Sequence, residues 1–216
     1  MKYLYSTLLL IIISFSANAQ LNKGLKQIGG SVSISHSTSE NDNSGISNSF
    51  TDQTTNAFSI TPSIGYFIKD NVSLNLSLGY SYSNSESERI DEDEVSEYSY
   101  TTNNLSITIS SRLHKSITDQ FYLFLQPGAS LNLRKYKDYS DDNDKNTAYS
   151  LGIRPGILYM ANDRFAFEGT FGFLGYTYSE SEPLDDSQST STSNNNNFRL
   201  DLSSITLDFG FRYYFK

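Results

Sequence analysis

Apolar and polar residues alternate with a period of two along most of the chain after residue 19, and this pattern limits the possible folds. In the segment NVSLNLSLGYSYS, the apolar side chains from Val72 to Tyr82 fall on one face, and Ser, Asn and Gly fall on the other. No segment after residue 19 shows convincing helical periodicity, so the pattern predicts an all-β protein. We expect eight antiparallel strands, near residues 28–34, 58–66, 72–82, 105–113, 121–133, 149–159, 165–173 and 198–215.

The connections between these expected strands alternate strictly between short and long. The short ones lie near residues 68–71, 114–119 and 160–164. The long ones are rich in Ser, Asn and acidic residues and span roughly 37–55, 83–98, 134–148 and 179–197. One end of the sheet therefore carries only short turns, and the other end carries only long loops. This asymmetry is typical of an up-and-down transmembrane β-barrel with three short periplasmic turns and four long outer loops.

Alternation alone does not distinguish two kinds of barrel. A soluble carrier barrel turns its apolar face inward around a ligand, whereas a membrane barrel turns it outward to lipid. Aromatic residues in this chain concentrate at the strand ends, as in the interfacial girdles of membrane barrels. They are Tyr66, Tyr159, Phe165, Phe167, Tyr213 and Phe215 at the short-turn end, and Tyr80, Tyr82, Tyr98, Tyr149, Tyr176 and Tyr178 at the long-loop end. The membrane barrel is favoured, and the soluble secreted carrier stays as an alternative.

The first residues have the parts of a cleavable secretory signal. Lys2 precedes an apolar run over residues 8–13, and Ala17 and Ala19 form a small-residue exit before Gln20. We therefore expect a signal peptide at 1–19 and one barrel domain at 20–216, with a retained N-terminal anchor as the alternative. The chain has no Cys, which excludes disulfides, thiolate metal sites and Cys nucleophiles.

The net charge of −8 argues against a nucleic-acid partner, because no basic patch is present. Catalysis has few candidate residues. His36, beside Ser35, Ser37 and Glu40, is the only arrangement that could serve at an outer rim, so we predict that the protein is not an enzyme and needs no cofactor. A lipid-modifying enzyme with its site at the rim stays as an alternative.

The closing stretch DFGFRYYFK places aromatic residues on every second position of the last expected strand. With this strand, residues 20–216 resemble the family of small eight-stranded outer-membrane β-barrel proteins of the Gram-negative type. In that family the last strand carries an assembly signal, which Asp208, Gly210, Tyr213 and Phe215 match in register. Lys216 departs from the pattern, because it follows the aromatic residue that is usually terminal. The resemblance implies outer-membrane lipid and the barrel-assembly machinery as partners, and the cell outer membrane as the location.

Isolated charges interrupt the polar face at mid-strand, where they would lie in the lumen. Because an unpaired buried charge is costly, we predict a neutralised network. Its members would be Arg112, Arg154, Glu168, Asp208 and Arg212. If Tyr159 pairs with Phe165, Arg154 lies one diagonal step from Glu168. The network would act as a structural plug or, alternatively, as a salt-bridge gate for ions.

Three prolines and one phase change interrupt the alternation. Pro62, Pro127 and Pro155 lie inside expected strands, where a proline cannot donate to the ladder, so each is expected at a bulge or a missing rung. The phase change near residues 203–204 predicts a bulge in the last strand.

The long connections are acidic, above all the stretch SESERIDEDEVSEY at 85–98, which could hold divalent cations or a basic partner. The stretch DNDKN places Asp142, Asp144 and Asn146 at the spacing that begins a calcium loop, but Thr147 stands where that loop needs Gly. We predict a monomer with a structural, adhesive or surface-binding role through these loops. A narrow channel for ions or small hydrophobic solutes is the main alternative.

Overall fold

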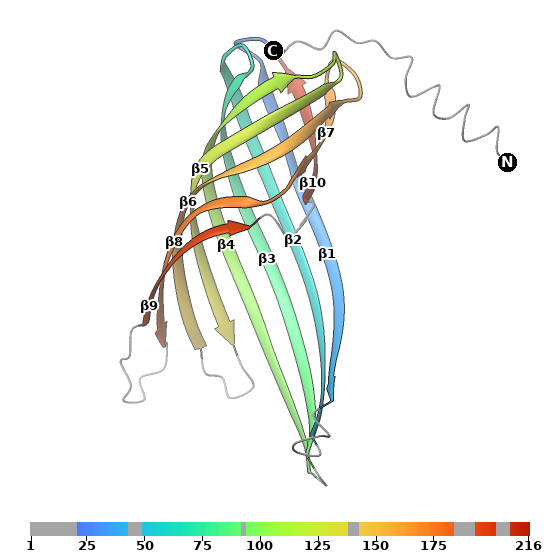
Figure 1. Cartoon of the computed structure of the whole chain (residues 1–216), viewed down its shortest axis with the longest axis vertical. Helices are drawn as coiled ribbons and strands as arrows, with labels where there is room; N and C mark the ends of the chain where they lie inside the picture. The colour runs from blue at the N-terminus through green and yellow to red at the C-terminus, as the bar shows by residue number, and fades with distance from the viewer. Residues whose placement is uncertain (1–20, 43–48, 92–93, 138–142, 184–192, 202–207) are drawn as a thin grey trace, which may run out of the picture.

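The structure is a computed structural model, and it describes residues 21–42, 49–91, 94–137, 143–183, 193–201 and 208–216. These residues form ten antiparallel strands in one sheet and no helix, which confirms the all-β prediction (Figure 1). None of the described residues forms a helix that is long and apolar enough to cross a membrane. The strands are β1 (Lys26–Asp42), β2 (Ser49–Lys69), β3 (Val72–Asp91), β4 (Glu94–Ser116), β5 (Phe121–Lys137), β6 (Asn143–Met160), β7 (Phe165–Thr170), β8 (Phe173–Pro183), β9 (Ser193–Asp201) and β10 (Asp208–Phe215).

The sheet closes on itself through β1 and β10. Each strand from β1 to β7 pairs with the next, β7 pairs with β10, and β10 returns to β1. The closing pair runs from Lys26 opposite Phe215 to Ser31 opposite Gly210. Beyond Ser31, β1 pairs only with β2 among the described residues, and β9 pairs only with β8. The ring is therefore complete near the end of the molecule where the short turns and the C-terminus lie (Figure 1).

The described residues form ten strands where the sequence pattern predicted eight, because the strand expected near 165–173 forms two strands and residues 202–207, between β9 and β10, lie outside the described residues. Both β7 and β8 pair with β6, which places them one after the other along its edge. The register shifts by one residue between them, since Gly156 faces Thr170 but Ile153 faces Leu174. The expected last strand corresponds to β9 and β10, and the predicted bulge near 203–204 lies outside the described residues.

The prolines lie at gaps in the ladders. Pro62 faces Gly30 on one side, but the pairing with β3 skips it. Pro127 faces Ile153, and the pairing between β4 and β5 skips it. Pro155 lies where β6 changes partner from β8 to β7, and its carbonyl oxygen accepts a hydrogen bond from the Phe171 amide at 3.1 Å. Missing rungs, rather than sheet edges, thus accommodate all three prolines.

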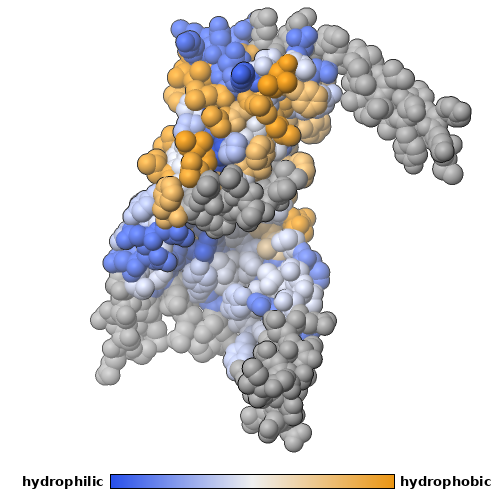
Figure 2. Space-filling view, in the orientation of Figure 1, coloured by the Kyte–Doolittle hydropathy of each residue, from blue (hydrophilic) through white to orange (hydrophobic). Residues whose placement is uncertain are grey.

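The two faces of the sheet differ as the alternation predicts. Apolar side chains stand exposed on the outward face, for example Ile109 at 65%, Leu151 at 66% and Phe209 at 70%. They gather around the half of the molecule that contains the short turns, and the other half is polar (Figure 2). Along β3, the apolar stretch from Leu74 to Tyr82 measures roughly 26 Å, close to the height of a membrane barrel's apolar band.

The expected long loops consist largely of strand. In particular, β1, β2, β3 and β4 continue well past the apolar band as a four-stranded projection (Figure 1). Along β2, Phe58 and Asp52 are roughly 20 Å apart. Polar Ser-, Thr- and Asn-rich segments pair through their backbones without any apolar alternation, so the expected loop boundaries at 37–55, 83–98, 134–148 and 179–197 were wrong.

An apolar cluster fills the inside of the barrel at the short-turn end. Residues 21–25 cross this end, held by hydrogen bonds at 2.8 Å from the Gly24 amide to the Phe67 carbonyl and from the Asn71 amide to the Leu21 carbonyl. The buried members of the cluster are Leu21, Phe67, Tyr122, Phe124, Leu158, Met160, Ala166 and Tyr214. We call this cluster the cap.

Candidate functional site

A buried ion triad lies in the lumen next to the cap. Glu168 on β7 contacts Arg112 of β4 and Arg212 of β10, and all three side chains are buried. Arg212 donates from Nε to Oε2 at 2.5 Å and from Nη2 to Oε1 at 3.0 Å. Arg112 forms an ion pair with Oε2 through Nη1 and donates from Nη2 to Oε1 at 3.2 Å. Each arginine thus binds both carboxylate oxygens, so the triad ties together strands from opposite parts of the ring.

Neighbouring side chains fix the two guanidinium groups. Arg112 donates from Nε to Gln126 Oε1 at 2.7 Å, and its Cζ lies 4.3 Å from the centre of the Phe124 ring. Arg212 donates from Nη1 to Ser63 Oγ at 3.2 Å. Because Phe124 belongs to the cap, the triad and the cap are in contact, and we call the two together the seal.

The other two expected members of the charge network are Arg154 and Asp208. Arg154 does not contact Glu168, and the side chain of Asp208 is not among the described atoms. Tyr159 faces Phe167 rather than Phe165, so the register that would bring Arg154 beside Glu168 does not form. The Arg154 guanidinium lies over the Phe173 ring instead, 5.0 Å from its centre. The backbone of Asp208 pairs with Thr170, but its side chain is outside the described atoms.

A polar chamber of about 600 Å³ opens on the other side of the seal. Its walls come from β4, β5, β6, β8 and β9, and the side chains that line it are mostly hydroxyls and carboxamides. Two arginines and two aromatic rings complete the wall. The lining residues are Ser106, Thr108, Ser130, Asn132, Arg134, Tyr136, Asn146, Ala148, Ser150, Arg154, Phe173, Thr177, Ser179, Asn195 and Asn197.

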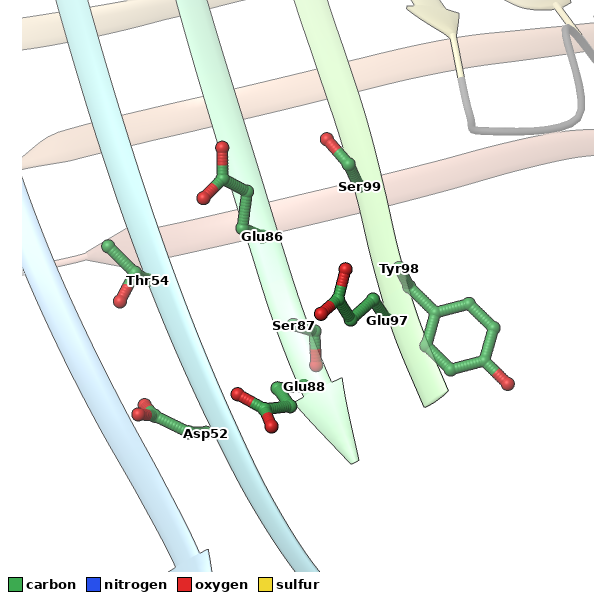
Figure 3. Close-up of a pocket in the computed structure, with 8 residues that line it drawn as sticks. All are labelled: Asp52, Thr54, Glu86, Ser87, Glu88, Glu97, Tyr98 and Ser99. Atoms are coloured by element: carbon green, nitrogen blue, oxygen red, sulfur yellow. The ribbon is translucent and has the colours of Figure 1, made fainter. Parts of the chain in front are cut away.

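A second cavity, of about 570 Å³, lies on the projection and is acidic (Figure 3). Asp52 of β2 faces Glu88 of β3, which faces Glu97 of β4, and Glu86 follows in the next row. Like charges directly opposite one another in a sheet repel. The projection therefore carries a concentrated negative charge at a point beyond the apolar band.

The family model described as the outer membrane protein beta-barrel domain matches residues 6–215. The chain belongs to this family. No protein among the curated sequences matches the chain. The exposed apolar band of this outer-membrane barrel is therefore its lipid-facing surface, and the seal and the chamber are parts of its lumen.

The residues of the expected assembly signal lie on the strand that closes this outer-membrane barrel. Gly210 faces Ser31 of β1 and Glu168 of β7, and a Cβ at this position would be tightly placed, 3.0 Å from the Gly30 carbonyl oxygen. The Tyr213 ring lies 5.0 Å from that of Phe165 and 6.1 Å from that of Phe215, centre to centre. Lys216 follows the strand and is exposed.

The weaker candidate sites differ from what the sequence suggested. His36 lies exposed on β1, and its Nδ1 is 2.7 Å from Asn56 Oδ1. Asp144 and Asn146 belong to β6, opposite Pro183 and Ser181, so the stretch that resembles the start of a calcium loop is part of a strand. Asp142 lies outside the described residues, in which no group of three or more His, Cys, Asp or Glu could hold a metal ion.

Sequence reasoning missed the cap and the chamber. The cap combines Leu21 with the lumen-facing Phe67, Phe124 and Tyr214, each of which interrupts an otherwise polar face. An apolar residue on the polar face near a short turn was the available signal. The chamber gives no comparable signal, because its Ser, Thr and Asn residues look like ordinary lumen lining.

Proposed function

We propose that this outer-membrane barrel is a monomeric surface protein whose sealed lumen conducts no solute and whose projection binds partners outside the cell. In this proposal the barrel wall counts eight strands, because β7 with β8 and β9 with β10 each take the place of one strand. Residues 1–19 are a signal peptide that is removed, and residues 20–216 form the barrel. The short turns face the periplasm and the four long hairpins face outward. Barrel-assembly machinery inserts the chain through the signal at Asp208, Gly210, Tyr213 and Phe215.

The seal across the lumen is the observation that carries this proposal. The triad of Arg112, Glu168 and Arg212 crosses the barrel, and the cap fills the space beside it. A barrel of about eight strands is only just wide enough for its own side chains. A solute path would have to break several charge-assisted hydrogen bonds and displace buried aromatic rings. This opposes the alternative of a narrow channel.

The acidic projection supports an adhesive or surface-binding role. Asp52, Glu86, Glu88 and Glu97 lie together on three paired strands that stand clear of the lipid band. Such a patch attracts a partner with a basic surface, and the attraction weakens as salt screens it. In this proposal His36, whose Nδ1 lies 2.7 Å from Asn56 Oδ1, has no catalytic role.

Planar-bilayer recording of the purified mature protein tests the sealed lumen. We expect no discrete conductance steps above those of protein-free bilayers. In contrast, Glu168→Ala combined with Phe67→Ala, which opens the triad and the cap together, should conduct if it still inserts. Steady conductance by the unaltered protein would overturn the proposal and favour the channel.

A shortened projection tests the binding role. Ser85 faces Tyr100, so replacing residues 86–99 by Asn-Gly closes the hairpin with a two-residue turn. The control keeps the length and removes only charge, through Asp52→Asn, Glu86→Gln, Glu88→Gln and Glu97→Gln. With oligolysine as the probe, both variants should lose most of the salt-sensitive binding and keep the heat-dependent mobility shift in SDS. Unchanged binding by either variant would contradict the role of the acidic patch.

A further inference from the structure

A group of basic side chains lies at the short-turn end of the barrel, beside the strands that close the ring. All of these side chains are exposed, and two acidic residues, Asp70 and Asp163, lie in the same turns. We call the group the basic patch, and its members are Lys23, Lys26, Lys69, Arg164 and Lys216. Because the protein as a whole has a net charge of −8, this excess of positive charge distinguishes the short-turn end from the acidic projection.

Backbone pairing brings the members of the basic patch together, although they are far apart in the sequence. Lys26 of β1 faces Phe215 of β10, which is the residue before Lys216. The Tyr214 amide donates a hydrogen bond to the Arg164 carbonyl oxygen at 2.8 Å, so Arg164 lies beside β10 on the side of β7. Three of the five cations thus lie next to one another across the closing strand.

The remaining members lie on the other side of β1. The Lys23 amide donates a hydrogen bond to Asp70 Oδ1 at 2.8 Å, which places Lys23 at the end of β2, where Lys69 is the last residue. Lys26 faces Tyr66 of the same strand. The basic patch is therefore continuous across four neighbouring strands, in the order β7, β10, β1 and β2.

The charge of the basic patch is not compensated within the described part of the chain. No described carboxylate forms an ion pair with any of its five side chains. Clustered charges of one sign repel one another and raise the local concentration of ions of the opposite sign. The basic patch is thus a surface that favours an anionic partner.

Aromatic rings adjoin the basic patch on the outward face. The Tyr213 ring lies 5.0 Å from the Phe165 ring and 6.1 Å from the Phe215 ring, centre to centre. Lys26 shares this face with Ile28, two residues further along β1, which is 46% exposed. At this end the apolar band meets a hydrophilic rim (Figure 2). Lysine stems can therefore lie along the apolar surface while their ammonium groups reach the level of lipid headgroups.

We propose that the basic patch binds an anionic phospholipid of the leaflet that surrounds the short-turn end. The lipid phosphate lies among the ammonium groups of Lys26 and Lys216, and the acyl chains follow the aromatic and aliphatic face beside them. Basic side chains at the membrane surface attract anionic lipids in this way. Lys216, which departs from the expected assembly signal, is thereby part of a lipid site. The site shares no residue with the projection, so it goes beyond the surface-binding role.

Quenching by brominated lipids tests this preference. The chain has no Trp, so Tyr66→Trp introduces a single fluorescent reporter opposite Lys26. The full mature chain is reconstituted at low salt in phosphatidylcholine vesicles that contain an equal minor fraction of brominated phosphatidylglycerol or brominated phosphatidylcholine. We expect phosphatidylglycerol to be enriched about fivefold or more at the reporter. Both lipids occupy both leaflets of the vesicle, so the result does not depend on the direction of insertion. Equal quenching by the two lipids would overturn the proposal.

Variants with the same reporter locate the preference in the basic patch. Lys26→Gln combined with Lys216→Gln should remove most of the enrichment, whereas Lys26→Arg combined with Lys216→Arg should keep it. Lys135→Gln combined with Lys145→Gln is the matched control, because these two lysines face each other across β5 and β6 near the long hairpins. Full enrichment in the first pair, with folding shown by the heat-dependent mobility shift, would overturn the site. An equal loss in the control pair would do the same.

Soluble probes distinguish a lipid from other anionic partners. Inorganic phosphate, compared with chloride at the same ionic strength, should leave the enrichment unchanged, and so should oligoglutamate. Loss of the enrichment in phosphate would assign the basic patch to a free anion, and loss in oligoglutamate would assign it to an acidic protein surface. Either result would overturn the lipid site. Neither bears on the binding of oligolysine to the projection, so the two proposals can fail separately.

Discussion

Glu168 is the shared counter-ion of two arginines in the lumen, because its single carboxylate binds both Arg112 and Arg212. Replacing it by Gln leaves two buried guanidinium groups without their counter-ion. Loss of one member of a buried ion pair typically costs about 3–5 kcal/mol. We expect Glu168→Gln to lower the urea midpoint and the temperature of the SDS mobility shift, whereas the exposed Glu86→Gln should change neither. A wild-type midpoint for Glu168→Gln would refute a structural role for the triad.

At the residue scale, the alternation predicts correctly which side chains face the lumen, but it predicts less well which residues they contact there. Glu168 and Arg212 are assigned to one face by parity alone. Arg154 was misplaced because Tyr159 pairs with Phe167, two residues beyond the expected Phe165. The length of the turn decides that register, and it depends on hydrogen bonds such as those that Asn162 Oδ1 accepts from the Arg164 and Phe165 amides.

Among the elements, the junction between β7 and β8 depends on one backbone conformation. Gly172 has a φ of 71°, which a side chain disfavours by about 1–2 kcal/mol. We expect Gly172→Ala to lower stability to urea by about that amount. Gly169→Ala is the control, because a Cβ there would only touch Ile157 at 3.7 Å. Equal stability of the two variants would show that the register shift does not need this conformation.

Sequence patterns predicted the strands inside the lipid band and missed their extensions. Inside the band, lipid demands an apolar residue at every second position, which leaves a clear period. Beyond it both faces meet water, so the strands from Ser83 to Asp91 and from Glu94 to Thr102 pair through their backbones without that period. The division of the expected seventh strand into β7 and β8 was missed for a similar reason. Gly172 between the two strands and the missing pair at Pro155 change the alternation of apolar and polar residues very little.

For the whole molecule, labelling can test the proposed orientation. The chain has no cysteine, so each introduced thiol is unique. Glu88→Cys lies on the projection, and Asp119→Cys lies in a short turn; both positions are exposed. In intact cells, a membrane-impermeant maleimide should label the first variant and reach the second only after the outer membrane is permeabilised. The reverse pattern would invert the proposed topology.

The closure of the ring and the sealing of the lumen use the same strand. All other neighbouring strands that follow one another can form as local hairpins, but β10 must join β1, from the opposite end of the described chain. β10 also brings Arg212 to Glu168 and Tyr214 to the cap. A barrel without β10 consequently lacks a wall segment and also lacks the hydrogen bonds from Arg212 to Glu168. One strand therefore makes both sets of contacts, so the wall and the interior of the barrel depend on each other.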